Sequence, residues 1–272
     1  MKYSIVIPSL FEVDSEYLKL CVDSLRDSGF DGQIIVVTNG TSHKPDLKHI
    51  KATHIHTPKQ GQCTATNYGA QLVTPDTDYL MISNSDMYYA PGWNENLRFD
   101  YPVFSPNLVE PTDNAGSAPP FLKVDGGLVA ETFRKTVVDE FIKDSIEDEI
   151  MEVEPGFNLP FFIKKDFWNF LGGYDTAFDP WGSNSDTDLQ TRINLAGVTP
   201  MRLRDVLVYH FSNKTPTFAP ENDAFRMNNF DYFKSKFGFD RDELGSDVWY
   251  NKDMIPEDKE RIKYAQDKYP TA

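Results

Sequence analysis

The chain has few cysteines, no long apolar run and no excess of positive charge. Cys21 and Cys63 are its only cysteines, so nothing predicts a disulfide framework or a thiolate metal cage. No stretch approaches the roughly 18 to 20 consecutive apolar residues of a membrane-spanning helix. Met1 and Lys2 lead directly into a β-like run instead of a signal-peptide pattern. We therefore expect a cytoplasmic protein without a transmembrane segment.

The charge balance is strongly acidic, with a formal net charge of -15 at pH 7. Such a charge repels a phosphate backbone, so we expect no stable binding to nucleic acid. An anionic substrate would need a local cation in its site, and a divalent metal would supply one. The 272 residues are 40% hydrophobic and 14% aromatic, which is enough to bury the core of one large domain or of two fused lobes.

The N-terminal third of the chain alternates between strand and helix patterns. The continuous apolar run over 33–37 is typical of a parallel strand that helices cover on both faces. Apolar residues between 14 and 28 recur at helical spacing, and Gly29 follows them. This β-α-β repeat predicts a nucleotide-binding type of half-domain. The expected strands cover residues 3–8, 33–37, 51–57 and 79–83, and the expected helices cover 14–28 and 62–73.

The rest of the chain is less regular. Residues 99–120 are rich in proline, which predicts extended segments and loops instead of long regular elements. Residues 139–154 are markedly acidic and predict a solvated helix or loop face, or a mobile flap over a site. Further on, the pattern predicts a strand over 161–163 and helices over 166–171, 186–195, 222–237 and 256–268.

Acidic residues follow apolar runs at places where ligands bind α/β proteins. Asn84-Ser85-Asp86 comes directly after the apolar run 79–83, and ligand crevices lie outside the carboxyl ends of such strands. An Asp in this position also forms turns, by capping local backbone groups. A second acidic cluster, Asp186-Thr187-Asp188, lies further along the chain, and His210 ends another β-like run.

The order of these motifs resembles that of family 2 glycosyltransferases over roughly residues 3 to 213. The N-terminal motifs are Ser4-Ile5-Val6-Ile7-Pro8-Ser9, the helix with Leu18 and Cys21-Val22-Asp23-Ser24-Leu25, Ile34-Ile35-Val36-Val37, Asn39-Gly40-Thr41, Gly61 and Asn67. The later motifs are Asn84-Ser85-Asp86, Leu171-Gly172-Gly173-Tyr174-Asp175 with Phe178, Asp186-Thr187-Asp188-Leu189 with Arg192, and Val208-Tyr209-His210. Each motif alone is common, and the resemblance lies in the ordered set.

The resemblance implies a GT-A (nucleotide-diphospho-sugar transferase) fold. In this α/β fold a mixed, mostly parallel central sheet is flanked by helices, and we expect a helical C-terminal extension beside it. Residues 1–215 would form the catalytic domain, with a nucleotide-sugar-binding half over 1–100 and an acceptor-binding half over 101–215. Residues 216–272 would form the extension packed on this core.

The implied activity is the metal-dependent transfer of a sugar from a nucleotide-sugar donor to an acceptor hydroxyl, on a glycan or another molecule. Asp86 and His210 match the positions of the metal ligands. Mg²⁺ and Mn²⁺ favour oxygen-rich shells completed by phosphates and water, and Mn²⁺ also accepts an imidazole. The alternative for His210 is a half-buried strand histidine without a ligand.

The resemblance also assigns the donor-binding residues. They are Pro8, Ser9, Phe11, Thr38, Asn39, Gly61, Asn67, Asn84, Ser85 and Asp86. The sequence departs from the family pattern at two places in this set. Thr38 and Asn39 stand where the family usually has an acidic residue that reads the nucleobase, so a uridine donor is not implied. Asn84 replaces the first Asp of the metal motif and leaves Asp86 as its essential carboxylate.

The transfer also needs a base for the acceptor hydroxyl. Asp186 matches the family's base position, although Ser185 precedes it where the family has Glu. Asp188 is the rival, and the alternative for Asp188 is a carboxylate stabilised by the helix dipole. Trp181 and Gly182 would shape the acceptor or sugar pocket, unless Trp181 only packs. An Asp base at this position implies inversion at the sugar carbon, whereas some GT-A enzymes retain the configuration, and the sequence does not show which face is attacked.

Other interpretations compete with these. A catalytically silent sugar-nucleotide or glycan-binding module could keep the same fold. A nucleotidyltransferase is disfavoured, because Pro8-Ser9-Leu10-Phe11 lacks the glycine and lysine of a phosphate loop. His54 and His56 would point the same way from a strand and could bind a separate metal, but no third ligand is near in sequence. The aromatic stripe over 225–237 predicts core packing, with membrane or partner docking as the alternative.

Overall fold

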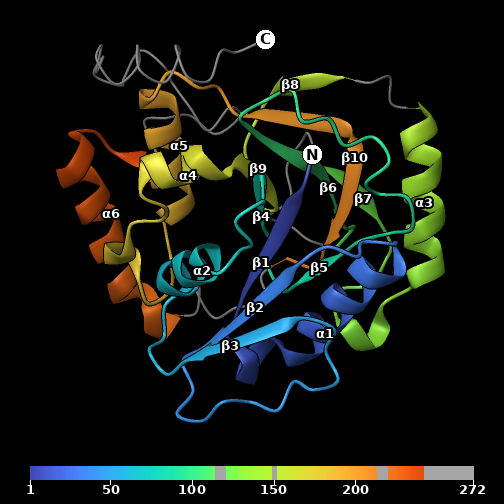
Figure 1. Cartoon of the computed structure of the whole chain (residues 1–272), viewed down its shortest axis with the longest axis horizontal. Helices are drawn as coiled ribbons and strands as arrows, with labels where there is room; N and C mark the ends of the chain where they lie inside the picture. Colours follow the sequence, from blue (N-terminus) through green and yellow to red (C-terminus); the bar gives the residue numbers. More distant parts are fainter. Residues whose placement is uncertain (114–120, 149–151, 213–219, 242–272) are drawn as a thin grey trace.

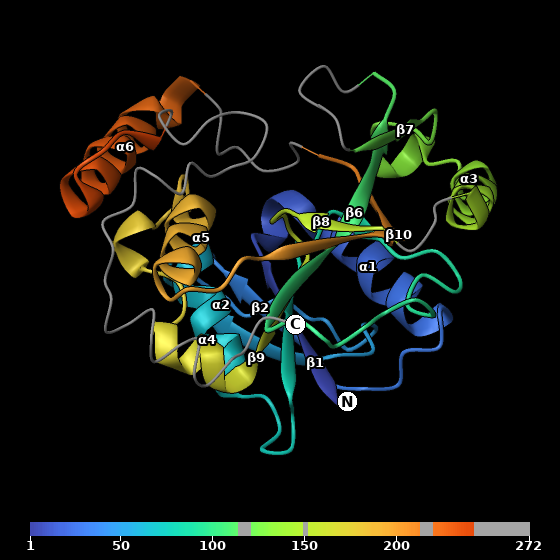
Figure 2. The ribbon, with the colours of Figure 1, turned by 90° about the horizontal axis from the view of Figure 1, so that it is seen from above.

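The computed structural model describes residues 1–113, 121–148, 152–212 and 220–241. One ten-stranded sheet runs through the molecule in the order β3-β2-β1-β4-β9-β6-β10-β5, with β7 paired to β6 and β8 to β10. Helices cover both faces of this sheet. Helices α2, α4, α5 and α6 lie on one side of it, and α1 and α3 lie on the other (Figures 1 and 2).

The N-terminal half of the sheet is parallel, as the sequence predicted. It contains β1 (Tyr3–Ser9), β2 (Ile34–Asn39), β3 (Thr53–Thr57) and β4 (Tyr79–Ile82). Strand β1 pairs in parallel with β2 and β4, and β2 pairs in parallel with β3. Helices α1 (Phe11–Asp27) and α2 (Gln62–Gln71) connect these strands. Because α1 and α2 bury opposite faces of β1 and β2, these two strands are apolar on both faces.

The C-terminal half of the sheet mixes parallel and antiparallel pairs. It contains β5 (Met87–Tyr88), β6 (Val103–Pro111), β7 (Leu122–Val124), β8 (Val153–Pro155), β9 (Phe161–Lys164) and β10 (Met201–His210). Strand β9 lies antiparallel between β4 and β6 and so joins the two halves. Strands β6 and β10 are parallel, whereas β5 and β8 run antiparallel to β10. The predicted mixed α/β sheet is thereby confirmed.

The remaining helices are α3 (Lys135–Asp148), α4 (Lys165–Leu171), α5 (Ser185–Leu195) and α6 (Asp223–Phe237). Short 3-10 turns cover Ala130–Thr132, Thr176–Phe178 and Pro220–Asn222. Side chains of α2, α4, α5 and α6 share one apolar core, in which Phe178, Leu189 and Phe233 are fully buried. Helix α6 therefore packs on the rest of the molecule through the same core as α5. The helix expected over 256–268 lies outside the described residues.

Strand β6 contradicts the prediction that residues 99–120 contain no long regular element. All nine of its residues are buried, although Pro106 and Pro111 lie within it. Pro106 is opposite Leu203, where the pairing with β10 shifts register, and the Pro106 carbonyl accepts a bond from Asn158 Nδ2 at 3.0 Å. Proline is tolerated in a strand where the ladder is already interrupted, and sequence alone does not show such an interruption.

Two further predictions are confirmed in part. The acidic segment begins inside helix α3, which is solvated on one side but buries Val138 and Ile142 against the sheet. The aromatic stripe of α6 buries Phe233 in the core, whereas Phe225 is 47% exposed. Within the described part of the chain, the helices are too short or too polar to cross a membrane.

Candidate active site

A cavity of about 510 Å³ opens at the carboxyl ends of the parallel strands. Ser9, Asn39 and His210 line it, and they end β1, β2 and β10. Pro8 of β1 also lines it, and the loops after the strands add Leu10, Gln60, Asn84, Ser85 and Asp86, together with Asp14 of α1. The segment around the start of α5, with α6 and the residues after it, adds Trp181, Gly182, Asn184, Asp186, Arg226, Phe230 and Arg241. Its position is the one at which α/β sheets bind ligands.

Backbone pairing brings Asp86 and His210 together. Asp86 directly precedes β5, and β5 pairs antiparallel with the end of β10, with Met87 opposite His210. The Phe211 backbone N–H also donates to the Asp86 carbonyl at 3.0 Å. As a result His210 Nε2 lies 3.5 Å from Asp86 Oδ2. The two predicted metal ligands therefore face each other across the cavity wall, although they are far apart in sequence.

Glu110 of β6 orients His210 from the other side of the ring. His210 Nδ1 donates to Glu110 Oε1 at 2.9 Å, which leaves Nε2 directed at Asp86. Burial alone would lower the pKa of His210, but the charges of Asp86 and Glu110 outweigh it and raise the pKa to about 9. The sequence analysis missed Glu110, which is a carboxylate inside an otherwise buried strand.

Asp14 is a second carboxylate that sequence reasoning placed only within a helix. It is 1% exposed, and it accepts bonds from Ser9 Oγ at 2.6 Å and from the Leu10 backbone N–H at 3.1 Å. Ser85 Oγ donates to its second oxygen. Burial raises the pKa of Asp14 despite these bonds, and the nearby charge of Asp86 raises it further. Asp14 thus ties the loop after β1 to the Asn84-Ser85-Asp86 motif.

Thr38 and the two strand histidines form a separate cluster. Thr38 is fully buried, and its Oγ1 lies 2.8 Å from His54 Nε2 and 3.1 Å from His56 Nδ1. Burial lowers the pKa of His54 to about 4, and the charges of Lys44 and His56 act in the same direction. The described residues contain no group of three or more His, Cys, Asp or Glu arranged to hold a metal. The histidines therefore hold Thr38 in place within the sheet.

Asn39 lines the cavity, but its amide is engaged. Its Nδ2 donates to the Ser9 carbonyl at 3.0 Å, and its Oδ1 accepts from the Gly61 backbone N–H at 3.1 Å. Gln60, which the sequence analysis did not single out, differs. Its side chain lies over Gly40, and its Nε2 is buried with no hydrogen-bond partner among the described residues. Gln60 therefore has a side-chain N–H available for a ligand at the end of the cavity near β2.

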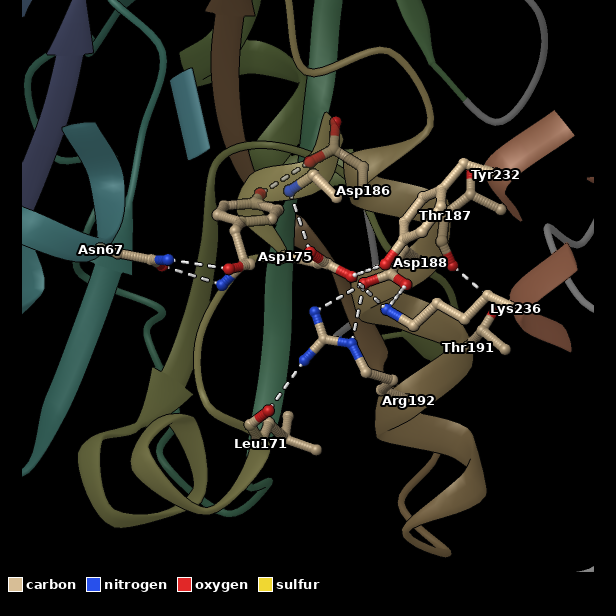
Figure 3. A network of polar contacts seen from close by, with 12 residues as sticks. Asn67, Leu171, Asp175, Asp186, Thr187, Asp188, Thr191, Arg192, Tyr232 and Lys236 are labelled. Carbon is tan, nitrogen blue, oxygen red and sulfur yellow. Dashed lines mark hydrogen bonds and ion pairs between the residues drawn. The ribbon is translucent and has the colours of Figure 1, made fainter. Parts of the chain in front are cut away.

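Asp186 is held by a tyrosine of the glycine-rich segment. Tyr174 Oη donates to Asp186 Oδ1 at 2.6 Å, and Asn67 of α2 fixes the Tyr174 backbone with bonds of 2.8 and 2.7 Å (Figure 3). Burial raises the pKa of Asp186, and this effect outweighs the hydrogen bond from Tyr174 and the charge of Arg241. Asn67 does not line the cavity, and its contact with Tyr174 explains its place in the motif set.

Asp188 has a different environment, although it is only two residues away. It is completely buried, and it does not line the cavity. Its Oδ2 accepts from Arg192 Nε at 2.8 Å, and its Oδ1 accepts from Lys236 Nζ of α6 at 2.5 Å. Lys236 also pairs with Asp175 at 2.7 Å (Figure 3). These contacts connect helices α5 and α6 through a charge network with the buried Asp188 at its centre.

Comparison with known proteins agrees with this architecture. Residues 4–98 match the model of the glycosyl transferase family 2. The chain has a family 2-like GT-A fold. Among solved structures, S. aureus TarS has 12% identity and a TM-score of 0.52, covering 89% of this chain and 73% of its own. GalNAc-T7 has 16% identity and a TM-score of 0.56, covering 99% of this chain but only 59% of its own. No curated protein matches the sequence.

The predicted site residues of this GT-A chain separate into two groups. The cavity brings together Pro8, Ser9, Asn39, Asn84, Ser85, Asp86, Trp181, Gly182, Asp186 and His210. Phe11, Thr38, Gly61, Asn67 and Asp188 do not line it. Gly61 has a packing reason, because a Cβ there would collide with the Asp179 carboxylate. Asp179 in turn accepts backbone bonds from Cys63 and Thr64 at the start of α2.

Proposed function

We propose that the protein is a glycosyltransferase that transfers a sugar from a nucleotide-sugar donor to an acceptor hydroxyl, with a divalent metal at Asp86 and His210 and with Asp186 as the base. One observation carries the proposal. The Asp86–His210 pair and Asp186 line the same cavity, so one bound donor can reach both a metal site and a base.

The side chains at Asp86 and His210 fit a divalent ion. A carboxylate oxygen and an imidazole nitrogen face each other at 3.5 Å, and Glu110 accepts the other ring N–H of His210, as carboxylates do behind metal-bound histidines. No third protein ligand of these types is arranged there in the described part of the chain, so phosphate oxygens and water would complete the shell. When bound, the ion supplies positive charge that stabilises the leaving diphosphate.

Asp186 supplies the proton acceptor for the transfer. The acceptor oxygen forms a bond to the anomeric carbon while its proton passes to the free carboxylate oxygen of Asp186. The bond between the anomeric carbon and the donor phosphate breaks, and the nucleoside diphosphate leaves with the electron pair. Attack from the face opposite the leaving group inverts the anomeric centre. The Tyr174 bond to Oδ1 holds the carboxylate in one orientation for this step.

The loop after β1 and the Asn84-Ser85-Asp86 motif are suited to hold the donor. Asp14 joins them through Ser9 and Ser85, so the two parts of the donor site are positioned by one buried carboxylate. Further support comes from GalNAc-T7, whose crystal structure contains UDP, GalNAc and Mn²⁺. Trp181 and Gly182 line the cavity before α5 and would contact the sugar or the acceptor.

A screen of nucleotide sugars tests this function. The full chain is melted with each donor in Mn²⁺, Mg²⁺ or EDTA, and slow sugar release is followed in the same samples. Selective binding should raise Tm by mass action. Wild-type protein and Asp186→Asn should bind one donor with metal, whereas Asp86→Asn should not. Asp125→Asn is the control, because this carboxylate is exposed and outside the cavity.

The outcomes separate the two candidate functions. Metal-dependent donor binding with sugar release by the wild type supports the transferase. Donor binding without release or transfer would identify a catalytically silent sugar-nucleotide-binding module. No stabilisation by any donor in either metal would refute the proposed donor site.

A further inference from the structure

The cavity wall around Asn184 contains a hydrogen-bond donor without a partner. Asn184 is 8% exposed and lines the cavity, and its Nδ2 is buried with no partner among the described residues. Its Oδ1 accepts from Arg241 Nη1 at 3.2 Å. Because Arg241 engages the oxygen, the amide nitrogen is the atom left to donate. An uncompensated buried donor of this kind is costly unless a ligand satisfies it.

The backbone at this position is also unusual. Asn184 has a φ of 67° and is one of two non-glycine residues with positive φ in the described chain, and the other, Ser212, lines the same cavity. Left-handed backbone is uncommon for residues other than glycine, although Asn adopts it more readily than most, and such conformations cluster at binding sites. Glycine would adopt this backbone with the least strain, but the chain has Asn184 at this position. The residue therefore adds an amide side chain to the cavity wall.

Two arginines lie in the same part of the cavity. Arg241 lies over the ring of Phe230, at 5.8 Å from its centroid, and Arg226 precedes Phe230 by one helical turn of α6. Arg226 also pairs with Asp223 at 2.9 Å. Apart from these two residues, the cavity lining contains no Lys or Arg among the described residues. In a chain of net charge -15, this wall therefore concentrates hydrogen-bond donors and positive charge.

The part of the cavity wall formed by Asn184, Arg226 and Arg241 adjoins the proposed base. Asn184 is two residues before Asp186, and the charge of Arg241 reaches Asp186. The metal and diphosphate end of the site is built differently, from the ends of β1, β4 and β10 with Asp14, Asp86 and His210. A group bound by Asn184 and the arginines would therefore belong to the molecule whose hydroxyl meets Asp186, which is the acceptor.

We propose that the acceptor carries an anionic oxygen group, a phosphate or a carboxylate, bound by Asn184 Nδ2 and the guanidinium groups of Arg241 and Arg226. This inference rests on the proposed transferase function and names the class of its acceptor. Phosphate and carboxylate both present oxygen acceptors to such donors, and charge-assisted bonds of this type are the strong ones. Phe230 would pack against the apolar part of the same molecule.

Matched acceptor pairs test the proposal. With the donor found in the screen, transfer is measured to glycerol 3-phosphate against glycerol, glucose 6-phosphate against glucose, and glucuronate against glucose. We expect kcat/KM for the better anionic member to exceed that of its neutral partner by about tenfold or more. Asn184→Asp keeps the oxygen that accepts from Arg241 but replaces the donor with a second oxygen, and it should reduce this ratio to near one.

Two further variants test whether the preference for anionic acceptors depends on the cavity arginine. Arg241→Gln should reduce the same ratio by about tenfold or more, whereas Arg134→Gln, an exposed arginine outside the cavity, should leave the ratio unchanged. Equal use of anionic and neutral acceptors by the wild type overturns the proposal. An equal rise of donor KM with both acceptor types in Arg241→Gln also overturns it, because the anion would then be the donor diphosphate.

If none of these small acceptors receives sugar, binding decides. Inorganic phosphate is titrated into protein saturated with nucleoside diphosphate and Mn²⁺, and tryptophan fluorescence reports the site that contains Trp181. Saturable binding by the wild type that weakens about tenfold or more in Asn184→Asp supports the proposal, and no difference between the two refutes it. Failure of the donor screen itself would instead refute the proposed function, because donor stabilisation and sugar release need no acceptor.

Discussion

Exchanging Asp186 and Asp188 separately for Asn should separate catalysis from stability. In Asp186→Asn the amide oxygen can still accept from Tyr174 Oη, which bonds Asp186 at 2.6 Å, so the fold should persist. The proton acceptor is lost, and removal of a general base lowers kcat by about 10² to 10⁴. This corresponds to about 3 to 5 kcal/mol of transition-state stabilisation.

Asp188→Asn should have the opposite effect. Asp188 is completely buried between Arg192 and Lys236, and removing its charge leaves the largely buried Arg192 guanidinium and the Lys236 ammonium with a weaker partner. Breaking a buried pair in this way costs about 3 kcal/mol or more. For a domain of this size, that loss lowers Tm by about 6 to 12 °C. Because Asp188 lies outside the cavity, kcat of the folded protein should fall by less than about tenfold.

The assay is a paired measurement of thermal unfolding and steady-state transfer for the wild type and both variants. Donor binding, followed by the metal-dependent shift in Tm, should survive in Asp186→Asn. The reasoning is refuted if Asp188→Asn loses transfer at unchanged Tm, which would make Asp188 the base. Loss of donor binding in Asp186→Asn would remove Asp186 from the base role.

Three further predictions concern the donor end and the pH dependence. Asp86→Ala should abolish metal-dependent donor binding, and isothermal titration with Mn²⁺ and donor would contradict this if affinity stayed within twofold of wild type. Because the pKa of His210 is raised to about 9, its contribution to the stability of the metal-free protein is full below about pH 6.5 and is lost as pH rises through 9. The loss is about 3 kcal/mol; urea unfolding at pH 6 and 9.5 should show it, and His210→Ala should not. Gln60→Glu replaces an amide N–H that has no hydrogen-bond partner by a carboxylate oxygen. It should raise the KM for the nucleotide sugar about tenfold with kcat nearly unchanged. The test is steady-state kinetics at saturating acceptor. An unaltered KM for the nucleotide sugar would exclude a contact between Gln60 and that substrate.

Local pattern predicted the first four strands and the two helices between them. In this part, continuous apolar runs such as 34–37 form buried strands, and apolar residues at helical spacing form helices with one buried face. The local residue pattern therefore suffices to predict each element. Strand β6 was missed because its prolines are compatible only with the register shift opposite Leu203. That shift depends on β10, which lies about a hundred residues later in the chain, and no local pattern contains it.

The site shows the same division. The ordered motifs singled out Asp86, Asp186 and His210 as candidates, and the structure brings these three residues to one cavity. The residues that hold them were not identified. Glu110 resembles an ordinary strand residue and Asp14 an ordinary helix residue until β10 and the Asn84-Ser85-Asp86 motif are placed beside them.

By itself, the sequence determined the α/β class, the GT-A resemblance and the candidate site residues, because periodicity and motif order are local or linear properties of the chain. The tertiary structure decided which carboxylate faces the cavity. Asp186 and Asp188 are alike in sequence, but one bonds Tyr174 at the cavity and the other is buried between Arg192 and Lys236 (Figure 3). Their roles differ because the helix directs them to different neighbours, and those neighbours come from distant parts of the chain.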